Sequence, residues 1–201
     1  MSKTSEKAPE KKIILASSSI YRRGLLERLR LTFEFESPDI DETVIGGETP
    51  ETTCIRLAKA KADTIARHQL AAIVIGCDQV AVVNGQAISK PGSYGPAVEQ
   101  LRAMSGQRIT FHSAVCLIQH DIQKTIEFSV PTHVTFRILT DAEIHRYLIA
   151  ETPYDCAGSA KSEGLGISLL DAIESTDPTA LIGLPLIALS KALRDFGVEL
   201  P

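Results

Sequence analysis

Residues 13–26 read IILASSSIYRRGLL, and this stretch predicts a strand, a short loop and a helix in succession. The loop and the first helical turn carry three hydroxyls and two cations, at Ser17, Ser18, Ser19, Arg22 and Arg23. Backbone N–H groups at a helix N-terminus favour an anion, and arginine offers a planar fork that matches phosphate oxygens. The stretch therefore predicts a phosphate site. An ordinary serine-capped helix with solvated arginines is the alternative.

Composition and charge narrow the class of protein. The chain has 201 residues, 44% of them hydrophobic, and a formal net charge of −4. This length and apolar content suffice for a sizeable core, and the charge argues against binding to a nucleic-acid polymer. No stretch approaches the roughly 20 apolar residues of a membrane span. Residues 1–12 are polar and lack the apolar centre of a secretory signal, so we expect a frayed tail, a single domain over 13–201 and a cytosolic protein.

The four cysteines are scattered and form no CxxC pair. We expect them to act as small buried hydrophobes in a reducing compartment. They are Cys54, Cys77, Cys116 and Cys156.

Helix and strand signals alternate along the rest of the chain. Helices are predicted over residues 21–30, 50–68, 96–104, 141–150 and 185–196, and strands over 13–16, 33–37, 71–76, 80–83, 107–122 and 123–139. The Asn84-Gly85 pair predicts a tight hairpin turn. We therefore predict one α/β unit with a long, largely antiparallel sheet, and the pattern leaves a division into two lobes open.

Charged residues in the loops and helices beside these strands are the candidates for chemistry. Asp78 directly follows the most hydrophobic strand, where a turn or cap residue is the alternative. Asp41 and Glu42 follow another strand, where a solvated acidic loop is the alternative. Lys61 lies on a helix among alanines, where a surface lysine is the commoner case. Lys90 precedes a proline and so belongs to an extended segment.

Together these residues are consistent with a site for a phosphoanhydride. Arginines and lysines would hold a polyphosphate, and carboxylates would hold a divalent metal while one of them activates water. The sequence contains no GxxxxGK[ST], no GxGxxG and no zinc-binding spacing among its five histidines. Residues 156–166 are small and glycine-rich, which allows a ligand to approach the backbone closely, although a surface turn is the alternative.

In combination, these motifs resemble those of the Maf family of nucleotide pyrophosphatases over nearly the whole chain after the tail. The resemblance rests on residues 15–19 with 22–23, 41–43, 56–58 with 61–62, 76–79, 90–91, 157–158 with 163–164, and 182–185. Such enzymes cut a nucleoside triphosphate between its α and β phosphates. The resemblance implies an elongated mixed α/β sheet with flanking helices and a cleft between two lobes, as in the inosine-triphosphate pyrophosphatases.

The resemblance also implies a role for each matched residue. Asp78 would accept a proton from water, and Glu42 and Asp78 would lie near a Mg²⁺ or Mn²⁺ ion. Phosphate contacts would come from Ser17, Arg22, Arg23, Lys61 and Lys90. The implied partner is a small nucleotide substrate, and a homodimer is compatible with the resemblance.

Three positions separate the branches of this family by nucleobase. The branch that acts on dTTP and UTP typically carries Arg, Thr and Gln there, whereas the branch similar to 7-methyl-GTP pyrophosphatases carries an aromatic residue, Gln and Glu. This chain has Tyr21, Gln79 and Glu163, which match the second pattern, although Trp is usual at position 21 and most relatives have Pro where this chain has Ile20.

The chemistry of the base favours the same branch. A cationic 7-methylguanine stacks well on an aromatic ring, and a carboxylate accepts hydrogen bonds from its N1–H and 2-amino group. We therefore expect hydrolysis of 7-methyl-GTP. Hydrolysis of dTTP and UTP is the alternative within the family. A non-catalytic nucleotide-binding regulator of cell division is the alternative outside enzymes.

Overall fold

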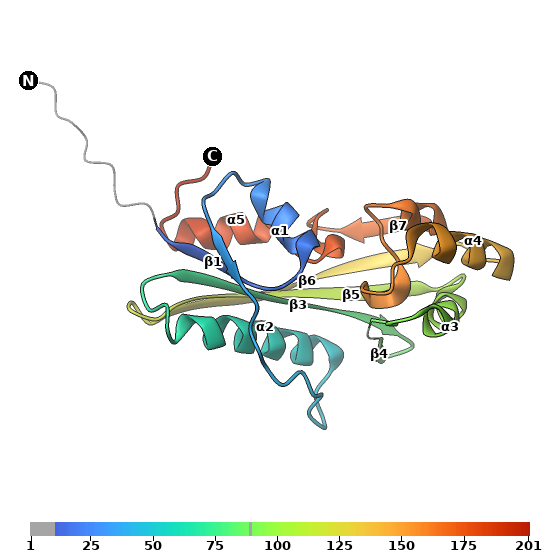
Figure 1. The fold of residues 1–201 in the computed structure, drawn as a ribbon, viewed down its shortest axis with the longest axis horizontal. Coiled ribbons are helices and arrows are strands. Elements are labelled where there is room, and N and C mark those ends of the chain that lie inside the picture. Colours follow the sequence, from blue (N-terminus) through green and yellow to red (C-terminus); the bar gives the residue numbers. More distant parts are fainter. Residues whose placement is uncertain (1–10, 89) are drawn as a thin grey trace, which may run out of the picture.

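The computed structural model describes residues 11–88 and 90–201, and their central element is a mixed sheet of seven strands (Figure 1). The strands are β1 (Ile13–Ala16), β2 (Glu34–Glu36), β3 (Ile73–Val83), β4 (Gln86–Ile88), β5 (Arg108–Gln119), β6 (Lys124–Phe136) and β7 (Leu170–Ser175). Their order is β2-β1-β3-β5-β6-β7, with β4 paired to β3. β1 runs parallel to β2 and β3, and the other pairs are antiparallel.

Five α-helices and three short 3₁₀ turns accompany the sheet within the described ranges. The helices are α1 (Ile20–Glu27), α2 (Pro50–Ala66), α3 (Tyr94–Met104), α4 (Asp141–Glu151) and α5 (Leu186–Asp195). The turns are η1 (Ala157–Ser159), η2 (Leu165–Leu169) and η3 (Ala180–Ile182). The α/β class predicted from the pattern of the sequence is confirmed.

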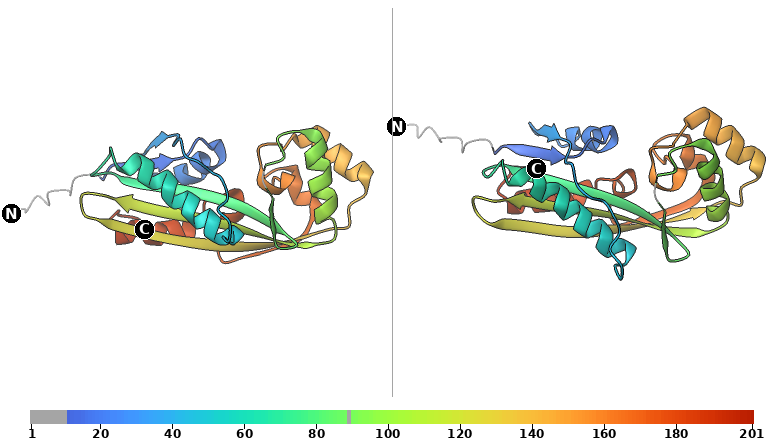
Figure 2. Two further views of the ribbon diagram at one scale, coloured as in Figure 1. Left: turned by 90° about the horizontal axis from the view of Figure 1, so that it is seen from below. Right: turned by 60° about the horizontal axis from the view of Figure 1, so that its bottom comes forward.

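Two lobes share the long strands β3, β5 and β6 (Figures 1 and 2). Helices α1, α2 and α5 pack at one end, where α1 and α5 cover one face of the sheet and α2 covers the other. Helices α3 and α4 pack at the opposite end around a separate apolar cluster that includes Leu101, Phe111, Phe136 and Leu148. The expected elongated shape with two lobes is therefore present.

Several local signals are confirmed in detail. Thr49 caps α2 ahead of a proline in the first turn, and Thr140 forms a reciprocal capping box with Glu143 at the start of α4. Asn84 and Gly85 both have positive φ values, 50° and 78°, as a two-residue turn between β3 and β4 requires.

Other boundaries differ from the predictions. The first helix ends at Glu27 instead of residue 30, because the chain turns there and Arg30 takes a left-handed φ of 54°. The third helix begins at Tyr94, two residues before the predicted start. The apolar stretch near residue 170 forms β7 at the edge of the sheet, preceded by η2.

Strand β3 leaves part of one edge unpaired. One edge pairs with β5 from Val74 to Val82. The opposite edge pairs with β1 up to Gly76 and with β4 from Ala81 onward, so the described strands leave residues 77–80 unpaired there. Since successive side chains of a strand alternate between faces, these residues reach both sides of the sheet at one point between the lobes.

The predicted tail, residues 1–12, lies almost wholly outside the described residues. At its end, the carbonyl of Lys12 accepts a hydrogen bond of 2.9 Å from the Ile73 N–H, so sheet pairing begins there. Within the described ranges, none of the helices has the length and apolar character needed to cross a membrane. All four cysteines are free; three are buried as predicted, while Cys156 is partly exposed.

Candidate active site

An ion pair between Asp78 and Lys61 lies at the unpaired edge of β3. The strand passes close to α2 because Gly76 has no side chain, and a Cβ there would lie 2.2 Å from the Ala58 carbonyl oxygen. Asp78 follows on the same face, and its Oδ1 lies 2.7 Å from Lys61 Nζ. The two side chains are only 14% and 11% exposed. The alternative of a surface lysine is therefore wrong for Lys61.

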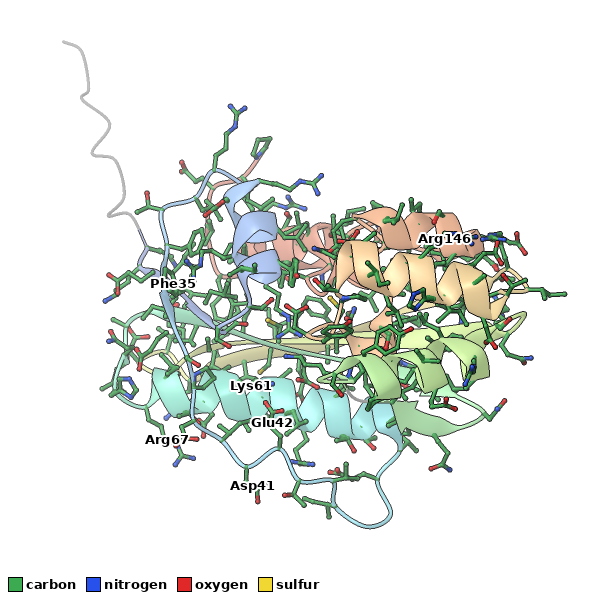
Figure 3. The ribbon with its side chains drawn as sticks, turned by 45° about the vertical axis from the view of Figure 1, so that its right-hand side comes forward. Phe35, Asp41, Glu42, Lys61, Arg67 and Arg146 are labelled. Atoms are coloured by element: carbon green, nitrogen blue, oxygen red, sulfur yellow. The ribbon has the colours of Figure 1, made fainter. Side chains whose placement is uncertain are left out.

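Glu42 completes this cluster from the loop before α2. Its Oε1 also lies 2.7 Å from Lys61 Nζ, and Figure 3 shows the two residues next to each other while Asp41 points outward from the loop. The hydrogen bond from Lys61 lowers the pKa of Glu42 below its ordinary value. Burial lowers the pKa of Lys61, but Asp78 and Glu42 raise it to a net value above the ordinary one, so the ammonium stays charged.

Arg22 enters the same region from the first turn of α1. Its Nε donates to the Gly183 carbonyl and its Nη1 to the Cys77 carbonyl, both at 3.1 Å. Burial lowers its pKa, but Cys77 and Asp78 raise it to a net value above the ordinary one. The guanidinium is therefore a fixed cation next to Asp78.

The serine loop forms the wall beside Arg22. Ser17 Oγ accepts a hydrogen bond from the Ser19 N–H at 3.2 Å, and Ser19 Oγ caps α1 by accepting from the Arg22 N–H at 3.4 Å. The loop nevertheless lines a cavity of about 330 Å³, together with Glu42 and Lys61. The capping role and the predicted position at a binding cavity are thus both present.

Two further cavities adjoin the first. One of about 90 Å³ is lined by Tyr21, Gln79 and Glu163, and one of about 610 Å³ contains Asp78. All three cavities share Arg22 and Lys90. The cleft therefore joins the phosphate-binding candidates other than Arg23, the carboxylates and the predicted base-specificity residues in one place.

The three specificity positions have different surroundings. The Tyr21 ring carries Lys161 Nζ 5.2 Å from its centroid, and burial is the main cause that raises the Tyr21 pKa. Gln79 Nε2 donates to the carbonyls of residues 180 and 181. Glu163 is exposed at the rim of the small cavity. The structure thus brings all three to one cavity.

Arg23 is the predicted phosphate ligand that the structure does not bring to the cleft. Its guanidinium carbon lies 3.4 Å from the centroid of the Phe35 ring on β2. Its Nε is buried without a hydrogen-bond partner among the described residues. Arg23 does not line any of the three cavities described above, so its phosphate contact stays a prediction.

Glu42 and Asp78 are the residues that could hold a metal ion. In the described part of the chain, no group of three acidic, histidine or cysteine side chains is arranged to bind one. Two carboxylates that already share one cation nevertheless suit Mg²⁺, which binds through one or two carboxylates and takes other ligands from water and phosphates. The donor set is therefore compatible with the expected metal.

Some residues around the site were not assigned a role from the sequence. Arg56 was noted only as part of a motif, yet its Nη2 donates to the Thr43 carbonyl at 3.1 Å, beside Glu42. Asp155 lies at the junction of the two smaller cavities, and Lys161 lies at Tyr21. These contacts join segments that are distant in sequence, so no local pattern could reveal them.

Comparison with known proteins gives a consistent picture. The family described as Maf-like protein matches residues 12–196. The 7-methyl-GTP pyrophosphatase of Cupriavidus pinatubonensis is 57% identical over 189 residues, which cover 94% of this chain and 95% of that protein. The protein of the same name from Burkholderia thailandensis is 57% identical over 192 residues, 94% of this chain and 89% of that protein.

A solved structure of the Ham1 protein from Staphylococcus aureus is similar at 20% identity and a TM-score of 0.46, covering 63% of this chain and 72% of that one. The family match and the identity to curated relatives cover almost all of the chain. This chain belongs to the Maf family.

Proposed function

We propose that this protein hydrolyses 7-methyl-GTP to 7-methyl-GMP and diphosphate. The observation that carries the proposal is the cluster of Asp78, Lys61 and Glu42 at the unpaired edge of β3, beside a cleft lined by cations. Relatives at 57% identity carry the name 7-methyl-GTP pyrophosphatase, which supports the choice of substrate.

Asp78 accepts a proton from water as that water attacks the α-phosphorus. The new bond joins the water oxygen to the α-phosphorus, and the bond from this phosphorus to the α,β-bridging oxygen breaks. The electron pair of that bond leaves with the diphosphate. The Lys61 ammonium, 2.7 Å from Asp78 Oδ1, orients the carboxylate for this step.

The cations of the cleft hold the triphosphate and offset the charge that develops on the leaving group. Arg22 is already oriented by two carbonyls, and Lys90 lies at the point shared by the three cavities. Ser17 and its neighbours offer hydroxyls at the same wall. Glu42 and Asp78 would hold a Mg²⁺ or Mn²⁺ ion, which would polarise the phosphate oxygens when bound.

The base is recognised on the other side of the cleft. A 7-methylguanine ring carries a positive charge and stacks on the face of Tyr21. Glu163 accepts hydrogen bonds from the N1–H and 2-amino groups. Both side chains line the small cavity beside Lys90, so a base bound there keeps its phosphates near the cations.

The test is diphosphate release from 7-methyl-GTP, GTP, dTTP, UTP and CTP, measured side by side with Mg²⁺ and with Mn²⁺. The proposal predicts the highest kcat/KM for 7-methyl-GTP. A lead for dTTP or UTP would retain the reaction and overturn the assigned base. Binding of nucleotide with no diphosphate release would favour a regulatory protein. A cytosolic location, a homodimer and the absence of nucleic-acid binding stay predictions from the sequence.

A further inference from the structure

One backbone turn contacts both the phosphate side and the base side of the cleft. The carbonyls of Ala180 and Leu181 lie 3.0 Å and 2.9 Å from Gln79 Nε2. The carbonyl of Gly183 accepts from Arg22 Nε at 3.1 Å. Residues 180–183 therefore orient a side chain from α1 and another from β3 at the same time.

These contacts decide which way the Gln79 amide faces. A carbonyl oxygen only accepts hydrogen bonds, so the amide group that faces Ala180 and Leu181 must be the NH₂. Ser113, which is fully buried, receives a third contact from Nε2 at 3.0 Å and donates its own hydroxyl proton to the Ala180 carbonyl at 2.6 Å. Both N–H groups of Gln79 are thus occupied by the protein.

The atom that remains for a ligand is Gln79 Oε1. Among the described residues, no hydrogen bond reaches this oxygen, whereas Nε2 has three acceptors. Gln79 lines the small cavity together with Tyr21 and Glu163. The side chain therefore offers an acceptor, and no donor, to whatever occupies that cavity.

The turn itself is held by a buried network, so it does not adapt freely to a ligand. Asp177, only 2% exposed, accepts from the N–H and hydroxyl of Thr179 through Oδ1. Its Oδ2 accepts from the N–H groups of Ile187 and Ala188 at the start of α5. Turning the amide over would place its oxygen against two carbonyls inside this fixed frame, at the cost of two hydrogen bonds.

We propose that the turn at Ala180–Gly183 makes Gln79 an obligate hydrogen-bond acceptor for the base, so that this position selects bases with an N–H donor on the facing edge. The inference rests on the proposed function and adds the chemical sense of one contact. In 7-methylguanine the N1–H and 2-amino groups together carry three hydrogens, of which Glu163 would use two, so one remains for Gln79. Gln79 and Glu163 would then both accept hydrogen bonds from the base.

The experiment changes the Gln79 side chain and the base, separately and together, and measures how far the two changes depend on each other. Wild type and Gln79→Met are compared with 7-methyl-GTP, with 7-methyl-ITP, which lacks the 2-amino donor, and with the N1-methylated analogue. Loss of one hydrogen bond predicts about a tenfold fall in kcat/KM for 7-methyl-GTP in Gln79→Met. With the analogue that lacks the contacted donor, the same substitution should have almost no further effect.

Full effects of Gln79→Met with both analogues would overturn the acceptor role. Failure of the proposed function would be visible separately, as a low rate with 7-methyl-GTP in the wild type. In that case, wild type and Gln79→Met are compared by their dissociation constants for 7-methyl-GMP, 7-methyl-IMP and the N1-methylated monophosphate.

A second variant tests how the surroundings of Gln79 orient its amide, without changing Gln79 itself. Ser113→Ala removes one partner of Nε2 and should reduce, about threefold, the discrimination between 7-methyl-GTP and the analogue that lacks the donor contacted by Gln79. The matched control is Ser129→Ala on the adjacent strand, because the Ser129 hydroxyl is buried with no hydrogen-bond partner in the described part of the chain. A lower Tm for Ser113→Ala with unchanged discrimination would assign this serine a structural role only and contradict its part in orienting the Gln79 amide.

Discussion

The two faces of β3 at its unpaired edge differ in how they hold their functional groups. On the α2 face, Asp78, Lys61 and Glu42 contact one another through side chains, and charge is balanced by charge. On the opposite face, the carbonyl-held face, backbone carbonyls accept hydrogen bonds from Arg22 and Gln79 and so hold both side chains. In the proposed function this difference suits the two tasks, because the ammonium balances the charge of the proton-accepting carboxylate while the carbonyls fix the directions of the groups that contact the ligand.

The difference also shows how one short strand segment serves two tasks. Adjacent residues of a strand point to opposite faces, so Asp78 and Gln79 lie back to back although they are neighbours in sequence. The Cys77 carbonyl before them accepts from Arg22. The carboxylate that accepts the proton in the proposed function is thus flanked in sequence by two residues that the other face holds in place.

The largest expected effect comes from a substitution on the α2 face. Asp78→Asn keeps an acceptor for Lys61 but removes the proton acceptor for water, so kcat should fall about 10³-fold with little change in Tm. The measurement is diphosphate release at saturating substrate. Asp41→Asn is the control, since Asp41 is an exposed carboxylate on the loop that carries Glu42. Turnover close to wild type in Asp78→Asn would remove this residue from the reaction.

The next largest effect comes from a substitution on the carbonyl-held face. Gly183 has a φ of 115°, and a Cβ there would lie 3.3 Å from Arg22 Nε. Gly183→Ala should therefore cost about 1–2 kcal/mol in backbone strain and displace the guanidinium, raising KM for the triphosphate about tenfold. Steady-state kinetics and thermal unfolding measure the two effects.

Gly106→Ala is the matched control for this substitution. Gly106 also has a positive φ, 68°, and its nearest contact would be the Ile138 side chain at 3.4 Å, with no site residue nearby. It should lower Tm without raising KM. Equal KM values in the two variants would show that the Gly183 carbonyl does not position Arg22.

Local sequence predicts much of this fold but not the pairing of the faces. The capping residue Thr49 and the turn at Asn84-Gly85 depend on neighbours in sequence, and both are where the pattern places them. The contact of Lys61 with Asp78 depends instead on how closely α2 approaches Gly76. Strand length and helix periodicity do not encode that distance.

Arg22 and Arg23 show the same limit within one motif. They are adjacent and chemically identical, so the sequence gives both the same expected role. On a helix, however, consecutive side chains point about 100° apart. Arg22 therefore enters the cleft while Arg23 lies over Phe35, and the choice between them depends on where β2 packs.

A smaller effect concerns the base side of the carbonyl-held face. Lys161 Nζ lies 5.2 Å from the centroid of the Tyr21 ring and 3.1 Å from Glu151 Oε1. In the proposed function, this ammonium would repel the cationic base that stacks on the same ring. Lys161→Met should therefore raise the preference for 7-methyl-GTP over GTP about threefold, and Lys161→Arg should not. The ratio of kcat/KM values measures it, and a lower ratio in Lys161→Met would contradict stacking on Tyr21.

The smallest expected effect concerns the ionic support of the α2 face. Arg56 donates a hydrogen bond to each carboxylate oxygen of Glu48, at 2.6 Å and 2.9 Å. It also donates to the Thr43 carbonyl next to Glu42. The hydrogen bond from Arg56 is the main cause that lowers the pKa of Glu48 from 4.5 to about 2. Since the folded pKa lies below the unfolded one, this pair stabilises the protein above pH ~4.5, and the contribution is lost as the pH falls toward ~2.

Glu48→Gln should therefore lower Tm by a few degrees near neutral pH and reduce the fall of Tm between about pH 5 and pH 3. Thermal unfolding across that range, with Glu99→Gln as a control on an exposed ion pair, measures the slope. Because Arg56 also holds the chain beside Glu42, acid should loosen the α2 face before the carbonyl-held face, whose donors are an arginine and an amide that do not titrate there. An acid slope in Glu48→Gln equal to that of the wild type would show that the pair of Glu48 with Arg56 is not a source of acid sensitivity on the α2 face.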